Sequence, residues 1–188
     1  MEVLIVLLVI VAVIAFAIIG LYNGLVVRRN RVDEATGQVE VQLKRRHDLI
    51  PNLVAAVKGY MDFEQDVLTR VTEARANAVA AGASGKLTAE QGAAENALSG
   101  TLRSLFAVVE NYPTLKANEN VMSLQEQLST TENQISFARQ HYNATVNEFN
   151  TAIQSFPAVL VAGPFGFAKR DFFAAEPEAQ EVPVVNLR

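Results

Sequence analysis

The chain has 188 residues, of which 50% are hydrophobic and 19% charged, and its formal net charge is −4. This acidic balance argues against a nucleic-acid binder, because such proteins usually present a basic face. There is no cysteine, which excludes disulfides, thiolate catalysis and Cys-ligated zinc, and two histidines leave little room for a histidine metal site. Beyond a membrane segment, the length leaves about one domain.

The first predicted element is an apolar run from Val3 to Ile19 that continues, past Tyr22, to Val27. At about 1.5 Å per residue, a helix of this length crosses a hydrocarbon core of roughly 30 Å. A cleaved signal peptide is disfavoured because Glu2 stands where a basic start is needed, and because Ala15-Phe16-Ala17 lies inside the run. We therefore predict a transmembrane anchor over residues 1–27.

Three arginines, Arg28, Arg29 and Arg31, follow the anchor, whereas Glu2 is the charged residue before it. The positive-inside rule places the arginine side in the cytoplasm. We therefore expect a single-pass protein of the bacterial inner membrane, with its N-terminus outside and its helical domain in the cytoplasm. Tyr22 and the three arginines are the predicted membrane-interface residues.

Residues 28–157 show helical periodicity almost throughout. The first helix is expected to run directly out of the membrane, with apolar positions from Val32 to Ile50. At Pro51, either a new helix begins, capped by Asp48, or one helix continues with a kink. A second stripe runs from Leu53 to Ala78, and residues 81–85 read as a loop.

A third helix is predicted to start at the capping box Thr88–Gln91 and to stop at Tyr112-Pro113. The fourth stripe, from Val121 to Phe156, is a mostly alternating 3,4 repeat of the coiled-coil type, and Pro157 ends it. Because each stripe must be buried, four such helices predict an all-α fold, an antiparallel up-and-down four-helix bundle with long helices.

Five charged residues fall on or beside the apolar stripes, and we expect them to form a polar network that fixes register within the bundle: Arg46, Glu64, Arg75, Glu132 and Arg139. A di-metal site would need Glu-x-x-His repeats, and neither His47 nor His141 has a Glu three residues before it. The two histidines are expected to be solvated or hydrogen-bonded. We predict no catalytic residue, no metal and no cofactor.

The tail, residues 158–188, carries four phenylalanines among glycines and a proline: Phe165, Phe167, Phe172 and Phe173. Burying one phenylalanine is worth roughly 1.5–3 kcal/mol. These rings are therefore expected to pack onto the helices, or to contact a neighbouring subunit or the membrane surface. Asn143, Asn147 and Asn150 either bond across helices or recognise a partner.

The chain resembles the LemA family of bacterial proteins over nearly its whole length, and the resemblance is carried by stretches that include Tyr22–Val26, Gln42–Val54, Asn111–Lys116, Glu132–Ile135 and Phe156-Pro157. Thr36-Gly37 departs from the family, which often has Trp followed by a small residue there. The resemblance implies one N-terminal anchor, a four-helix antiparallel bundle and no accepted enzymatic activity. It also implies an association with membrane biogenesis and with membrane metalloproteases.

The leading hypothesis is a membrane-anchored, self-associating scaffold without catalytic activity, which organises or shapes the bilayer or recruits partners to it. Its expected partners are the lipid bilayer, further copies of the chain and another membrane protein, with no nucleic acid. The alternative is an adaptor or regulator of a membrane protease or of a cell-envelope stress system. An enzyme ranks third, with Glu64 and Glu132 as its candidate residues.

Overall fold

The computed structural model describes residues 1–59 and 64–173. Its long helices are α1 (Glu2–Lys58), α2 (Gln65–Ala81), α3 (Ala89–Val109) and α5 (Glu119–Gln154). Short turns of helix are η1 (Gly82–Ser84), α4 (Pro113–Lys116) and α6 (Val159–Ala162). None of the residues in these two ranges lies in a strand. The predicted all-helical class is confirmed.

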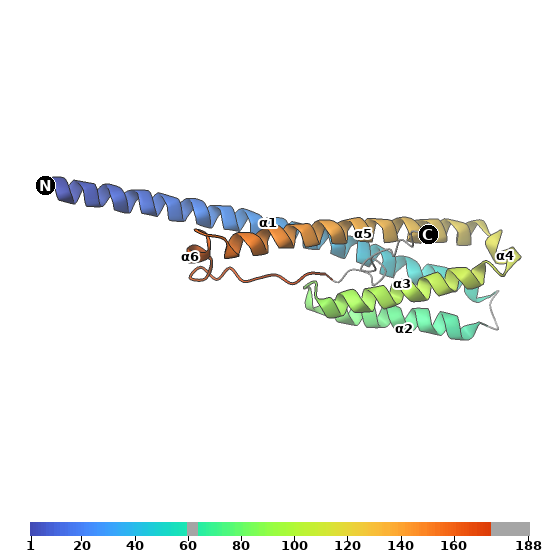
Figure 1. The fold of residues 1–188 in the computed structure, drawn as a ribbon. Helices are drawn as coiled ribbons and strands as arrows, with labels where there is room; N and C mark the ends of the chain where they lie inside the picture. The colour runs from blue at the N-terminus through green and yellow to red at the C-terminus, as the bar shows by residue number, and fades with distance from the viewer. Residues whose placement is uncertain (60–63, 174–188) are drawn as a thin grey trace, which may run out of the picture.

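Helix α1 extends far beyond the other helices at its N-terminal end (Figure 1). It has 57 residues, so it is roughly 85 Å long at 1.5 Å per residue. Residues 1–20 are exposed and Leu25 is the first buried residue. The projecting part is long and apolar enough to cross a membrane. Among the described residues, none of this apolar stretch is buried, so a bilayer is the environment that its composition fits.

Of the two alternatives at Pro51, the structure has the continuous helix, because α1 runs through this proline, and the stripe from Leu53 to Ala78 is therefore divided between α1 and α2. Leu53 and Val57 belong to the end of α1, and α2 starts only at Gln65. Proline has no N–H, which leaves the carbonyl of the residue four positions earlier without its helical partner. That residue is His47, and Arg75 Nε of α2 donates to its carbonyl at 2.7 Å. The helix persists because α2 satisfies the carbonyl.

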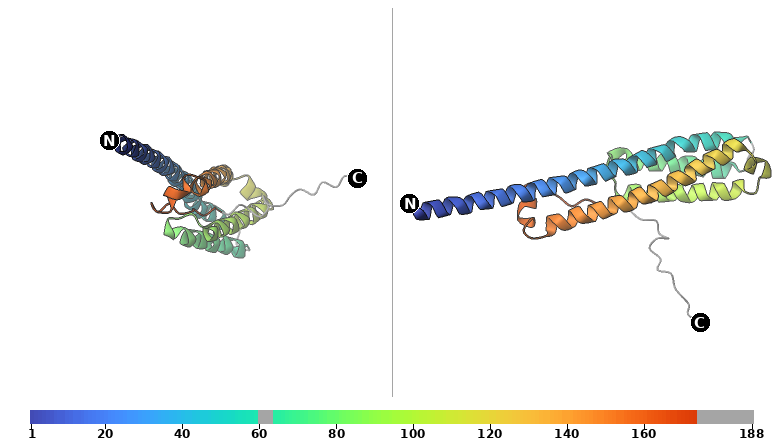
Figure 2. Two further views of the ribbon diagram at one scale, coloured as in Figure 1. Left: turned by 60° about the vertical axis from the view of Figure 1, so that its left-hand side comes forward. Right: turned by 90° about the horizontal axis from the view of Figure 1, so that it is seen from above.

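The helices alternate in direction, and α1 pairs along its length with α5 while α2 pairs with α3 (Figures 1 and 2). The buried positions of α1 repeat at intervals of three and four residues, as do most of those on α5. This spacing keeps one stripe of each helix facing the other. The long seam predicted for the fourth helix is therefore the α1–α5 contact.

Two apolar clusters make up the core. The distal cluster joins all four long helices, with Ile50, Val71, Leu102 and Leu128 among its members. The anchor-side cluster is built mainly from α1, α5 and the chain after α5. Arg46 is fully buried between Leu43 of the anchor-side cluster and Ile50 of the distal cluster. A charged layer thus separates the two halves of the core.

After α5 the chain forms α6, turns at Gly166 and runs back along α1 and α5 (Figure 1). Gly166 has φ of 74°, a left-handed conformation that favours glycine. Residues 167–173 then take the place beside α1 and α5 that α2 and α3 occupy at the distal end. Phe167 and Phe173 are buried in the anchor-side cluster. The tail therefore completes the core of this half.

The predicted cap at Thr88 is present, because its hydroxyl accepts a hydrogen bond from the Gln91 amide at 3.1 Å. Asn118 does the same for α5, where its Oδ1 accepts from the amides of Asn120 and Val121. Residues 82–84, expected to be loop, form the turn η1, and Gly85 ends it with φ of 63°. These local signals fix where α3 and α5 begin.

Candidate functional site

The buried charged layer is centred on Arg46, whose guanidinium binds both Glu95 and Glu132. It also donates to Ser99 Oγ at 2.7 Å, and Ser99 Oγ lies 3.2 Å from Glu132 Oε2. His47 Nε2 lies 3.2 Å from Glu95 Oε1. The layer joins α1, α3 and α5 at one level of the core. Glu95 was not predicted as a member of the network. It lies on the same face of α3 as Leu98 and Leu102, and a single acid on an apolar face looks, from the sequence, like a solvent-exposed residue.

Burial works to raise the pKa of the Glu95 carboxyl, since it penalises the charged form. The hydrogen bond to His47 and the charge of Arg46 act the other way, and the net pKa lies below its ordinary value. Glu95 is therefore held as a carboxylate. A guanidinium set between two carboxylates gives the layer the character of a structural ion-pair network.

The other predicted network residues have different partners. Arg75 binds the His47 carbonyl, and Arg139 donates to Asn96 Oδ1 at 2.8 Å and lies over the Phe173 ring at 4.8 Å. Glu64 is the N-cap residue of α2 and is not part of the Arg46 layer. The structure thus brings Arg46 and Glu132 together and places Glu64, Arg75 and Arg139 elsewhere. Within residues 1–59 and 64–173, no group of three or more acids or histidines is arranged to hold a metal.

Two asparagines of α5 hold the returning tail. Asn143 Nδ2 donates to the Phe173 carbonyl at 3.0 Å, and Asn143 Oδ1 accepts from the Phe173 amide at 2.9 Å. Asn150 makes the same pair of bonds with Arg170, at 2.8 and 2.9 Å. We call Asn143 and Asn150 the tail clamp. Asn147 is exposed and takes no part in it.

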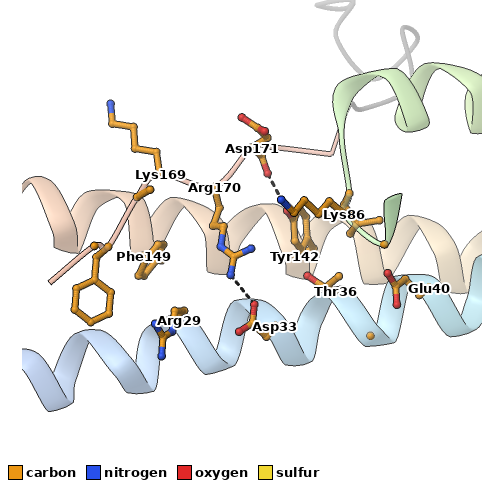
Figure 3. A pocket seen from close by; sticks show the side chains of 16 residues that line it. Arg29, Asp33, Thr36, Glu40, Lys86, Tyr142, Phe149, Lys169, Arg170 and Asp171 are labelled. Carbon is orange, nitrogen blue, oxygen red and sulfur yellow. Dashed lines mark hydrogen bonds and ion pairs between the residues drawn. The ribbon is translucent and has the colours of Figure 1, made fainter. Parts of the chain in front are cut away.

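A groove of about 630 Å³ lies between the tail, α1 and the turn after α2 (Figure 3). Arg170 crosses it to Asp33 at 2.9 Å, and the Tyr142 hydroxyl donates to the Asp171 carbonyl at 2.8 Å. Burial raises the pKa of Tyr142, and the charges of Asp171 and Asp33 add to this against the opposing effect of Arg170. The lining of the groove includes both positively and negatively charged side chains. The contacts of Arg170 and Asp171 hold the tail against α1 and α5.

Aromatic rings gather where α1 leaves the body. Tyr22 lies 5.1 Å from the Phe165 ring and 5.6 Å from the Phe167 ring, measured between centroids. The Arg29 guanidinium stacks over Phe167 at 5.4 Å. Two of the predicted membrane-interface residues, Tyr22 and Arg29, therefore touch the tail. Of the four tail phenylalanines, Phe167 and Phe173 are buried, whereas Phe165 and Phe172 are about half exposed.

A second groove, of about 820 Å³, is lined by residues of α1 and α5, and we call it the outer groove. Phe137 is 71% exposed there and Val41 is 63% exposed. His141 also lines it, as do Gln42 and Gln134, whose side-chain oxygens are buried. The outer groove thus combines exposed apolar surface with polar side chains.

Comparison with known proteins identifies relatives along almost the full chain. It is 25% identical to the magnetosome protein MamQ of Magnetospirillum gryphiswaldense, over 88% of this chain and 68% of that protein. It is 26% identical to MamQ 2 of Paramagnetospirillum magneticum, over 94% and 74%. It is 25% identical to the protein LemA of Metamycoplasma hominis, over 95% and 80%. The LemA family profile matches residues 35–187, and the chain therefore belongs to the LemA family.

Proposed function

We propose that this protein is a membrane-anchored scaffold without catalytic activity that associates with copies of itself. The projecting apolar part of α1 and membership of the LemA family support a membrane location. The proposal further places the body on the cytoplasmic side of a bacterial inner membrane, with Glu2 outside, because Arg28, Arg29 and Arg31 follow the anchor. The bilayer and a second copy are its proposed partners.

The observation that carries self-association is the outer groove. A phenylalanine that is 71% exposed on a regular helix, beside a valine exposed to 63%, is costly to leave in water. Tethering in a bilayer raises the effective concentration of copies, so that a contact of this modest size suffices.

Site-directed disulfide formation tests this proposal directly, because the chain has no cysteine of its own. Phe137→Cys in the membrane-embedded protein should give a covalent homodimer on oxidation. Val79→Cys, exposed on α2, is the matched control and should stay monomeric. Equal dimer yields from the two positions, or none from Phe137→Cys, would show that the outer groove is not a self-association surface.

A second variant separates loss of association from loss of the fold. Phe137→Glu places a charge in the outer groove but leaves the buried seam unchanged, so the helix content should be unaffected. We expect the detergent-extracted protein to shift to a smaller species in native electrophoresis. If Phe137→Cys instead traps a different membrane protein in cells, the adaptor hypothesis replaces the self-associating scaffold.

A further inference from the structure

The segment that joins α5 to the tail exposes a compact set of apolar side chains. Phe156 is 81% exposed, Leu160 66% and Phe165 54%, and Val159 is also exposed. This segment contains the short helix α6, on whose opposite side Val161 and Ala162 are buried against the body. Residues 156–165 therefore form an amphipathic element with an apolar outer face, which we call the α6 segment.

The α6 segment lies level with the end of the apolar run of α1. Phe156, Pro157 and Ala158 line one groove together with Gly20 and Leu21. Nearby, the rings of Tyr22 and Phe165 are 5.1 Å apart. About 20 helical residues cross a hydrocarbon core of roughly 30 Å. Counted from Val3, the boundary of this core on the side of the helical body therefore lies near Tyr22, beside the α6 segment.

Charged side chains follow at the depth where lipid headgroups would lie. Arg28 and Arg29 stand about two helical turns beyond Leu21 on α1. Lys169 and Arg170 follow the α6 segment on the returning tail, and Arg170 is bound to Asp33, one helical turn beyond Arg29 on α1 (Figure 3). Apolar groups at the boundary with cations just outside it are the pattern of an interfacial membrane element.

We propose that the α6 segment is a second membrane contact, which inserts Phe156, Leu160 and Phe165 into the leaflet from which α1 emerges. Lipid is the occupant that the structure favours, because the exposed face continues the surface of the anchor at the same depth. Attachment at two points limits the rotation of the helical body about the axis of α1. The proposal does not depend on self-association through the outer groove.

Depth-dependent fluorescence quenching tests the proposal, because the chain has no tryptophan. Phe156→Trp and Leu160→Trp report on the α6 segment. Met122→Trp is the control, because Met122 is 51% exposed near the start of α5, roughly 50 Å from Phe156 along the helix axis and outside the outer groove. All three replaced side chains are exposed, so the fold tolerates the larger ring. The full-length variants are reconstituted in phosphatidylcholine–phosphatidylglycerol vesicles with bromines on the upper acyl chain.

We expect both α6 tryptophans to lose most of their emission to the bromolipid and to emit at shorter wavelength, while Met122→Trp keeps its emission. Acrylamide, an aqueous quencher, should show the reverse order. Two results would overturn the proposal. One is bromolipid quenching at Phe156→Trp and Leu160→Trp no greater than at Met122→Trp. The other is shielding from acrylamide without bromolipid quenching, which would mean that protein, not lipid, covers the segment.

Discussion

Arg46 is a buried cation at the junction between two apolar clusters, where its guanidinium meets Glu95, Glu132 and Ser99. An arginine at a seam position buries less apolar surface than a leucine or isoleucine would. We therefore expect Arg46 to fix the relative position of the helices rather than to add stability alone. Its partners come from α3 and α5, and it therefore ties the register of α1 to both helices.

Removing Arg46 should be strongly destabilising. Arg46→Met keeps the length of the side chain but leaves Glu95 buried without its cation, a change that costs about 3–5 kcal/mol. Lys44→Met is the matched control, since it breaks only the exposed pair with Asp48 on the same helix and should cost about 0.5 kcal/mol or less. Denaturant unfolding in detergent measures both. Equal midpoints would contradict a central role for Arg46.

Acidification should destabilise the fold through Glu95. The pKa of Glu95 is lower in the folded state than its ordinary value of 4.5, so the unfolded chain takes up the proton first as the pH falls. Stability is therefore complete above pH 4.5 and declines as the pH falls through the folded pKa. Thermal unfolding between pH 7 and pH 3 should show this decline. It should be shallower in Glu95→Gln, and an unchanged slope would assign the acid sensitivity to other carboxyls.

At the scale of the elements, Pro51 and Arg75 act as one unit. Proline frees the His47 carbonyl, and the guanidinium of α2 binds it, so α1 and α2 are joined at the point where α1 lacks a bond. In the natural chain, Arg75→Met should cost about 1.5–3 kcal/mol, as expected for a hydrogen bond from a charged group. In a Pro51→Ala background, the restored amide competes for the same carbonyl and the cost should fall markedly.

A double-mutant cycle measures this coupling as the difference between the two costs of Arg75→Met. Additive effects of Pro51→Ala and Arg75→Met would show that the arginine stabilises α2 by some other contact. The cycle is informative because each single variant retains the remaining packing of Ile50 and Leu53.

The tail clamp should decide whether the C-terminal segment stays on the body. Asn143→Ala with Asn150→Ala removes four hydrogen bonds, each worth about 1 kcal/mol. Trypsin should then cut after Lys169 or Arg170 at least about tenfold faster, since local opening controls cleavage. Asn147→Ala, between the two positions but exposed, is the control and should cleave as the natural chain does. Equal rates would mean that Phe167 and Phe173 hold the tail alone.

The helices could largely be predicted from the sequence, and particular residues show why. The 3,4 spacing on α5 and the Thr88 cap are local signals, so the helix class and the start of α3 followed from them. The end of α1 could not be predicted from local signals, because the effect of Pro51 is offset by Arg75, which lies 24 positions further along the chain. The tail pairing was equally hidden, since Asn143 and Asn150 reveal their role only when Phe173 and Arg170 are beside them.

At the scale of the whole molecule, the direction of insertion is the property to test. We expect Glu2 outside the cell and the body inside, because cations are retained on the cytoplasmic side. In whole cells, a membrane-impermeant maleimide should label Glu2→Cys, while Val79→Cys should react only after permeabilisation. The absence of natural cysteine removes background labelling. Labelling of Val79→Cys in intact cells would reverse the orientation.

The unbroken course of α1 from the bilayer to the far end of the body has a mechanical consequence. From Leu25 to Lys58 the helix rises roughly 50 Å, so a change of about 10° in the inclination of its lipid-embedded part swings the distant tip by roughly 9 Å. Membrane helices adjust their inclination when hydrocarbon thickness changes. The continuous α1 is thus a lever, in which a small change in the inclination of the N-terminal part moves the far end of the body by nearly the diameter of a helix.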